Sequence, residues 1–237
     1  MDCFGSQFAP IVPNYFERRS QYHVGGVLTG MNTNEEISNE LLPYRHNKVI
    51  PAAIEKNVLQ ALSYYPELKN ARISFIFKTN IKTSVMQAQP VFNTLLQKRA
   101  KRRYRINISA HFKLIHCDMP ITKIPDEVMI GWIGHELGHI LDYEHRSNTG
   151  IISFGYQYLF SPTYVKEAER VADTYAVERG LGKYILATKR FILDHAELPQ
   201  SYKNKIAKLY LSPDVIVELV KKLETKEEAV QVQPSTG

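Results

Sequence analysis

The sequence predicts an α+β fold in which a small mixed sheet packs on one buried helix and a helical part follows toward the C-terminus. Three observations lead to this fold class. The chain has 237 residues, of which 44% are hydrophobic, so it can bury the core of one compact domain. Strand-like alternation is confined to the part before residue 120. Helical periods dominate after that point.

The first half of the chain is expected to contribute one helix and two strands. Residues 51–65 have the apolar spacing of an amphipathic helix. Residues 72–78 and 104–114 alternate between apolar and polar side chains, which is typical of strands with one buried face. Between the two strands, the residues around 87–90 are expected to form a loop.

Residues 135–139 read His-Glu-Leu-Gly-His, an HExxH motif. Residues four apart in a helix lie on one face, so His135 and His139 would direct two imidazoles at one point. Zinc binds imidazole nitrogen at about 2.0–2.1 Å, which this arrangement allows. Glu136 would lie beside that point, where a base can deprotonate an activated water. The motif therefore predicts a zinc site with Glu136 as general base.

A helix over residues 126–146 is predicted to carry this motif. Pro125 and Asp126 suit its start, because proline is tolerated there and an acid favours the helix dipole. Gly134 and Gly138 would each weaken the helix by about 1 kcal/mol relative to alanine, which is plausible where it packs closely on another element. Its buried face is marked by Val128, Ile133, Leu137, Ile140 and Leu141.

A catalytic zinc site needs a third protein ligand, and His145 is one candidate. It would complete the spacing of the metzincin peptidases, which also requires a glycine at position 142 and a later methionine turn. Position 142 is Asp142, and no methionine follows Met129. In a continuing helix, His145 lies about 240° around the axis from His139 and faces away. We interpret His145 as a histidine whose charge suits a helix C-terminus.

Glu169 is the second candidate for the third ligand. A Ser-Pro pair and Gly180 mark the ends of a helix predicted over residues 162–179. Glu169 and Asp173 lie one turn apart on it, among alanines that permit close packing. Glu169 can therefore reach a metal, and Asp173 can accept the outer N–H of a ligating histidine. The alternative is an acidic stripe that faces water.

The pairing of HExxH with a later Glu-x-x-x-Asp resembles the gluzincin zinc metallopeptidases over roughly residues 70–180. The resemblance implies a zincin-like fold, Zn²⁺ as cofactor and hydrolysis of peptide bonds. It also implies an edge strand beside the cleft that holds an extended peptide by main-chain pairing. The implied roles are zinc ligation by His135, His139 and Glu169, general base catalysis by Glu136, and orientation of a ligand by Asp173.

Gluzincins also use a tyrosine, histidine or arginine to stabilise the oxyanion. The sequence leaves this residue open among six candidates, each of which could instead serve ordinary packing. They are Tyr156, Tyr158, Tyr164, Tyr175, His195 and Tyr202.

Residues 98–105 place six cations in eight positions of a chain with a formal net charge of +6. We interpret this basic run as a solvated loop. It could instead follow the phosphates of nucleic acid or of an anionic membrane. It contains one aromatic residue, which is too few for the stacking platform expected with single-stranded nucleic acid.

Location is expected to be cytoplasmic. No apolar stretch approaches the 18 residues needed to cross a bilayer, and the first residues lack the features of a secretory signal. Cys3 and Cys117 make no disulfide framework. The apolar segment 151–160 is too short to span a membrane and is expected to pack over the active site, with shallow membrane contact as the alternative.

We therefore expect a zinc metallopeptidase whose partner is a peptide or protein substrate. Its domain would cover residues 45–200, after an irregular arm or covering segment at 1–44 and before a helical extension with a frayed tail at 201–237. The alternatives are a nucleic-acid-associated protease or binding module that uses residues 98–105, and a zinc-bound interaction protein without hydrolytic activity. Oligomeric state is left open.

Overall fold

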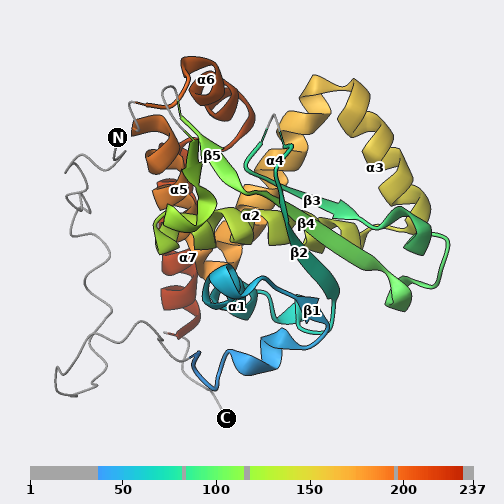
Figure 1. The fold of residues 1–237 in the computed structure, drawn as a ribbon. Coiled ribbons are helices and arrows are strands. Elements are labelled where there is room, and N and C mark those ends of the chain that lie inside the picture. The colour runs from blue at the N-terminus through green and yellow to red at the C-terminus, as the bar shows by residue number, and fades with distance from the viewer. Residues whose placement is uncertain (1–36, 82–83, 115–117, 195–196, 232–237) are drawn as a thin grey trace, which may run out of the picture. The chain divides into compact units, whose positions relative to one another are not determined.

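A computed structural model of the chain describes residues 37–81, 84–114, 118–194 and 197–231 (Figure 1). By its contacts the chain divides into two units, Met1–Ile37 and Ser38–Gly237. The elements below belong to the second unit, which has the predicted α+β fold with a small sheet and a helical C-terminal part. Most of the expected N-terminal arm, as well as Cys3, Cys117 and His195, lies outside the described residues.

The strands are β1 (Lys48–Val49), β2 (Arg72–Lys78), β3 (Met86–Pro90), β4 (Arg103–Ser109), β5 (His111–Lys113) and β6 (Asp118–Pro120). The α-helices are α1 (Glu55–Ser63), α2 (Asp126–His145), α3 (Asn148–Phe160), α4 (Pro162–Ala176), α5 (Gly182–Asp194), α6 (Gln200–Leu209) and α7 (Pro213–Gln231). Short helical turns are η2 (Leu42–Arg45), η3 (Ala52–Ile54), η4 (Pro66–Leu68), η5 (Phe92–Thr94), η6 (Arg99–Lys101), η7 (Ile121–Lys123) and η8 (Val177–Leu181).

The main sheet has the strand order β1-β2-β4-β3. Strands β1, β2 and β4 run parallel, and β3 pairs with β4 in the antiparallel direction, with Ala88 opposite Ile106. The residues around 87–90 therefore form an edge strand, and the expected loop is wrong. The pattern of β3 is mostly polar because only Met86 is fully buried, and Pro90 at its end is compatible with an edge position.

The strand predicted over 104–114 is divided between two sheets. Its first part is β4, and its second part, β5, pairs with β6 in a separate two-stranded sheet. The break falls at Ala110, whose N–H donates to the Lys78 carbonyl at 2.8 Å. The Ala110 carbonyl in turn accepts a bond from the Ile121 N–H at 3.0 Å. Apolar alternation continues through the break, so the sequence pattern does not reveal it.

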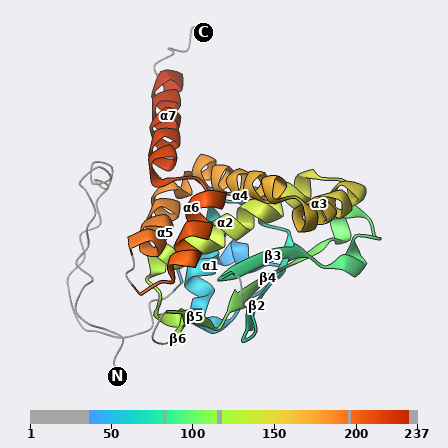
Figure 2. The same cartoon turned by 90° about the horizontal axis from the view of Figure 1, so that it is seen from above.

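Helix α2 lies at the centre of the unit and contacts α1, α4, α5 and β3 (Figures 1 and 2). Two of its glycines, Gly134 and Gly138, lie where neighbouring elements come close. A Cβ atom on Gly138 would lie 2.6 Å from the Ala172 carbonyl oxygen of α4, and one on Gly134 would lie 2.8 Å from Leu181. The close packing expected at these glycines is thus present.

Helix α4, predicted over residues 162–179, differs from expectation at its end. Gly180 has a φ of 88° and breaks the regular helix, as predicted, but the chain continues through η8 directly into α5. Helix α6 falls within the helical extension expected over residues 201–237, whereas the helical form of residues 148–160 was not predicted. Within the described ranges, we find no helix with the length and apolar character needed to cross a bilayer.

Candidate metal centre

Helix α2 holds the HExxH side chains in the interior. Every residue from Val128 to Tyr143 is buried, because other elements surround this helix. His135 and His139 are each 6% exposed and Glu136 is 8% exposed. Polar groups are costly to bury unless they have partners, so this cluster requires a specific compensating arrangement.

Helix α4 supplies that arrangement by placing Glu169, which is 4% exposed, against both histidines. Its Oε2 atom lies 3.1 Å from His135 Nε2 and 3.6 Å from His139 Nε2. The three potential ligand atoms all lie within 4.8 Å of one another. Ligand atoms at about 2.0–2.1 Å from a tetrahedral zinc ion are about 3.3 Å apart, so the donor set and its spacing fit such an ion.

Asp173 fixes the orientation of His135 from the far side of its ring. The carboxylate is fully buried, and its Oδ1 atom lies 2.8 Å from His135 Nδ1. It also accepts bonds from Lys189 Nζ at 3.0 Å and from the Leu211 N–H at 3.0 Å. Burial alone would raise the pKa of Asp173, but Lys189 and His135 lower it below its ordinary value. An ionised Asp173 keeps the Nδ1 proton in place and leaves Nε2 to face Glu169.

The two carboxylates make this a site that attracts cations. Burial by itself would lower the pKa of His135, yet Asp173 and Glu169 together raise it to about 10. Burial would raise the pKa of Glu169, but His139 and His135 hold it well below its usual range. The pocket therefore favours a positive charge between these side chains, which a metal ion can supply as well as a proton.

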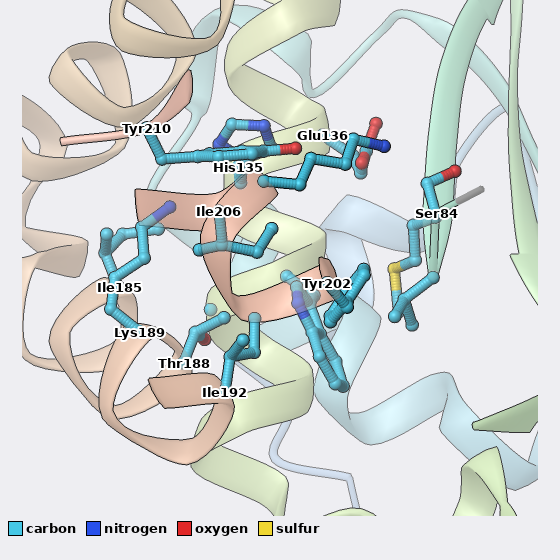
Figure 3. A pocket seen from close by; sticks show the side chains of 15 residues that line it. Ser84, His135, Glu136, Ile185, Thr188, Lys189, Ile192, Tyr202, Ile206 and Tyr210 are labelled. Atoms are coloured by element: carbon cyan, nitrogen blue, oxygen red, sulfur yellow. The ribbon is translucent and has the colours of Figure 1, made fainter. Parts of the chain in front are cut away.

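Glu136 lies next to the edge strand β3. Its Oε2 atom accepts a bond of 2.6 Å from the Ala88 N–H. Burial raises the pKa of Glu136 above its ordinary value, against the opposing effect of His135 and His139. A cavity of about 30 Å³ adjoins it, which is enough for a water molecule (Figure 3). Glu136 and His135 line this cavity together with apolar side chains of α2, α5 and α6 and with Lys189 and Lys205.

Three tyrosines surround the centre. Tyr158 donates a bond of 2.5 Å to Glu169 Oε1, on the side away from the histidines. Tyr202 lines the cavity, as does Tyr210, whose ring centroid lies 5.2 Å from that of His135 (Figure 3). Lys189 Nζ lies 4.0 Å from the Tyr210 ring centroid. The sequence singled out Tyr158 and Tyr202, but neither Tyr210 nor Lys189 stands in a recognisable motif.

The other sequence candidates lie away from the centre. Tyr156 is 67% exposed and contacts Phe160, and Tyr164 packs on Phe154. His145 Nδ1 lies 3.2 Å from the hydroxyl of Tyr175 in an exposed contact. The helix continues through Asp142, so His145 does not join His135 and His139, as the helical geometry predicted.

A search of known protein families, of curated proteins and of solved structures found no match to this chain. The functional conclusions below therefore rest on the residues and their geometry.

Proposed function

We propose that the protein is a zinc-dependent metallopeptidase of the gluzincin type, with a zincin-like fold. One observation carries the proposal: the ligand atoms of His135, His139 and Glu169 lie within 4.8 Å of one another in the interior. Two imidazoles and one carboxylate form a known donor set of catalytic zinc, and three ligands leave one position open.

A zinc ion held by these residues would supply a Lewis acid that activates a water molecule and polarises a carbonyl group. Glu136 would accept a proton from a water molecule on its carboxylate as the water oxygen attacks the peptide carbonyl carbon. It would then pass the proton to the nitrogen of the leaving amine when the C–N bond breaks. Burial raises the pKa of Glu136 above its ordinary value, which strengthens this carboxylate as a proton acceptor.

The edge strand β3 is the part of the sheet that would hold the substrate. It lies beside α2, and β4 covers only one of its edges. The Ala88 N–H, however, donates to Glu136, and the Ala88 carbonyl accepts a bond of 3.4 Å from Tyr143. An extended peptide would therefore pair with β3 on either side of Ala88 or displace these two bonds.

Tyr202 and Tyr210 are the phenols that we propose as donors to the oxyanion. Both line the cavity next to Glu136, and the Tyr210 hydroxyl is directed toward the Glu136 side (Figure 3). Tyr158 is committed to Glu169 by its short bond. Tyr202→Phe and Tyr210→Phe distinguish the two. Loss of the phenol that stabilises the oxyanion should lower kcat by about 10²-fold or more, with little effect on KM.

Mass-spectrometric profiling of a diverse peptide library with the zinc-loaded protein tests the proposal. We expect cleavage by the wild type and a loss of about 10²–10⁴-fold in rate for Glu136→Gln, which removes the base but keeps the shape of the side chain. Metal content, measured by plasma mass spectrometry, should stay the same in this variant. Glu127→Gln, an exposed position on the same helix, is the matched control.

Two results would contradict the proposal. One is equal cleavage by the wild type and Glu136→Gln, which would assign the hydrolysis to another group or to a contaminant. The other is a zinc-loaded wild type that cleaves no peptide of the library, which would favour a zinc-bound interaction protein.

A further inference from the structure

Helix α3 exposes apolar side chains and carries no charge. None of its thirteen residues is Asp, Glu, Lys or Arg, and only Ile151 and Phe154 are buried. Its exposed large apolar residues are Ile152 (47%), Tyr156 (67%), Tyr158 (36%), Leu159 (77%) and Phe160 (70%). Residues 152, 156 and 159 follow the spacing of one helical face, so these side chains form a continuous apolar stripe.

A second exposed apolar area lies in the basic segment, which we define as residues 91–103. Phe92 is 73% exposed and Leu96 is 89% exposed. They stand next to exposed cations, namely Lys98, Arg99, Lys101 and Arg103. Arg99 lies 3.7 Å from Glu144 in a solvent-exposed contact. The solvated loop expected over residues 98–105 is only partly present: residues 98–101 and 103 are exposed, but Arg102 and Tyr104 are buried and residues 103–105 belong to β4.

Specific bonds attach the basic segment to the first turn of α3. Arg102 is buried and donates to Asn148 Oδ1 at 2.6 and 2.9 Å and to the Tyr143 carbonyl at 3.0 Å. Asn148 Nδ2 donates in return to the Gln97 carbonyl at 3.2 Å. Figures 1 and 2 both place α3 and this segment at the same end of the unit. The cations and the apolar stripe are therefore held in one region.

We propose that α3 and the basic segment form a docking surface for an anionic lipid bilayer. The apolar side chains of α3, with Phe92 and Leu96, would enter the boundary between headgroups and acyl chains, while the cations contact lipid phosphates. Thirteen helical residues extend about 20 Å, which is too short to cross a hydrocarbon core of about 30 Å, so the helix lies in the plane of the interface.

The combination of features distinguishes a membrane from nucleic acid. Nucleic acid would use the cations but has no need of an uncharged helix with exposed Leu159 and Phe160. Tyr104, in the basic run, is 1% exposed and cannot stack on a base, and the single aromatic residue of the basic segment, Phe92, is too few for a stacking platform. Tyrosine is enriched at the membrane interface, and phenylalanine and leucine are typical of the apolar face of interfacial helices.

This docking would place the metal centre close to the lipid surface. Tyr158, on α3, donates to the ligand Glu169, and Ser161 at the end of α3 caps α4 through a bond to the Tyr164 N–H. The inference goes beyond the proposed peptidase function and is independent of it, because lipid binding can be measured with the inactive Glu136→Gln protein.

Flotation of the full chain with lipid vesicles tests the inference. Vesicles of phosphatidylcholine alone are compared with vesicles that also contain phosphatidylglycerol, at low and at high salt. We expect the wild type to bind the anionic vesicles at least tenfold more strongly, with a decrease at high salt because the cations are screened. Circular dichroism melts verify that each variant below is folded.

Two double variants separate the two parts of the surface. Lys98→Glu with Lys101→Glu should lower partitioning into anionic vesicles by about 30-fold or more, since each cation contributes about 1 kcal/mol. Leu159→Ser with Phe160→Ser should lower it by about tenfold or more through lost apolar burial. The matched controls are Lys113→Glu with Lys123→Glu, and Leu42→Ser with Val215→Ser, all exposed positions elsewhere. These controls should change binding by less than about twofold.

Several results would overturn the inference. These are no binding to anionic vesicles, equal binding to neutral and anionic vesicles, or binding that survives in both double variants. Another is a wild type that does not bind vesicles but binds RNA or DNA tightly and in a salt-dependent way, when Lys98→Glu with Lys101→Glu abolishes that binding. A last one is self-association that Leu159→Ser with Phe160→Ser abolishes, which would make a second copy of the chain the partner of α3.

Discussion

Helices α2 and α3 follow each other in the chain and distribute their side chains in opposite ways. Helix α2 keeps histidines and carboxylates inside, at 6–9% exposure for His135, Glu136, His139 and Asp142. Helix α3 has no charged residue and exposes most of its apolar side chains, with Leu159 and Phe160 at 70% or more. Each helix thus departs from the common rule that apolar groups are inside and charges outside.

This difference in burial indicates whether the groups that compensate each helix lie inside the chain or outside it. The buried histidines of α2 have partners within the chain, Glu169 and Asp173, and Asp173 is paired in turn with Lys189, so this cluster could hold a cation. The exposed apolar groups of α3 have no such compensation in the described part of the unit. Burial of charge therefore indicates internal chemistry, and exposure of apolar surface indicates an external contact.

The largest expected effect is on zinc affinity, when Glu169, the carboxylate that faces the histidines of α2, is substituted. Glu169→Gln keeps the size of the side chain but replaces an anionic ligand by a neutral amide. We expect zinc affinity to fall by more than about 100-fold, since loss of an orienting partner alone costs 10–100-fold. Competition with a chromophoric chelator measures this. Glu167→Gln, an exposed acid two residues earlier, should leave affinity unchanged, and equal affinity in both variants would show that another residue is the third ligand.

The next effect concerns the stability of the buried charge network. Asp173→Ala should lower the free energy of unfolding by about 3–5 kcal/mol, because Lys189 then remains buried without its carboxylate. Denaturant unfolding measures this. The exposed pair of Arg179 and Glu67 provides the control, since Glu67→Ala should cost at most about 1 kcal/mol.

The double variant Asp173→Ala with Lys189→Met sharpens this prediction. Removal of the unpaired cation should recover part of the lost stability. A double variant that is less stable than Asp173→Ala would mean that Lys189 stabilises the fold through other contacts, such as its position over Tyr210.

The sequence predicted the parts of the site that depend on local geometry. A helix fixes the directions of residues four apart, so the convergence of His135 with His139 and the departure of His145 both follow from spacing alone. Helix signals and nearby alanines made Glu169 a candidate ligand and the resemblance between motifs supported it, but no local rule brings together two helices that far apart in sequence. The structure places them together, but the identity of the ion stays a prediction.

The missed features depend on long-range packing. Lys189 and Tyr210 reach Asp173 and His135 because α5 and the end of α6 fold back on α4, and neither residue has a distinctive neighbourhood in the sequence. Strand β3 has a mostly polar sequence and exists because β4 offers it a free edge. The apolar run 151–160 was expected to pack over the active site. Its exposure follows from its position at the end of the unit.

The prediction with the smallest expected effect compares one glycine of α2 with one glycine of α3. A Cβ atom on Gly138 of α2 would lie 2.6 Å from the Ala172 carbonyl oxygen, whereas one on Gly155 of α3 would meet nothing within 4 Å. Gly138→Ala should therefore destabilise the protein by about 1–3 kcal/mol, since backbone must move. Gly155→Ala should stabilise it by up to about 1 kcal/mol through helix propensity. Thermal melts of both variants measure this, and a destabilising Gly155→Ala would indicate that α3 is covered by another part of the chain.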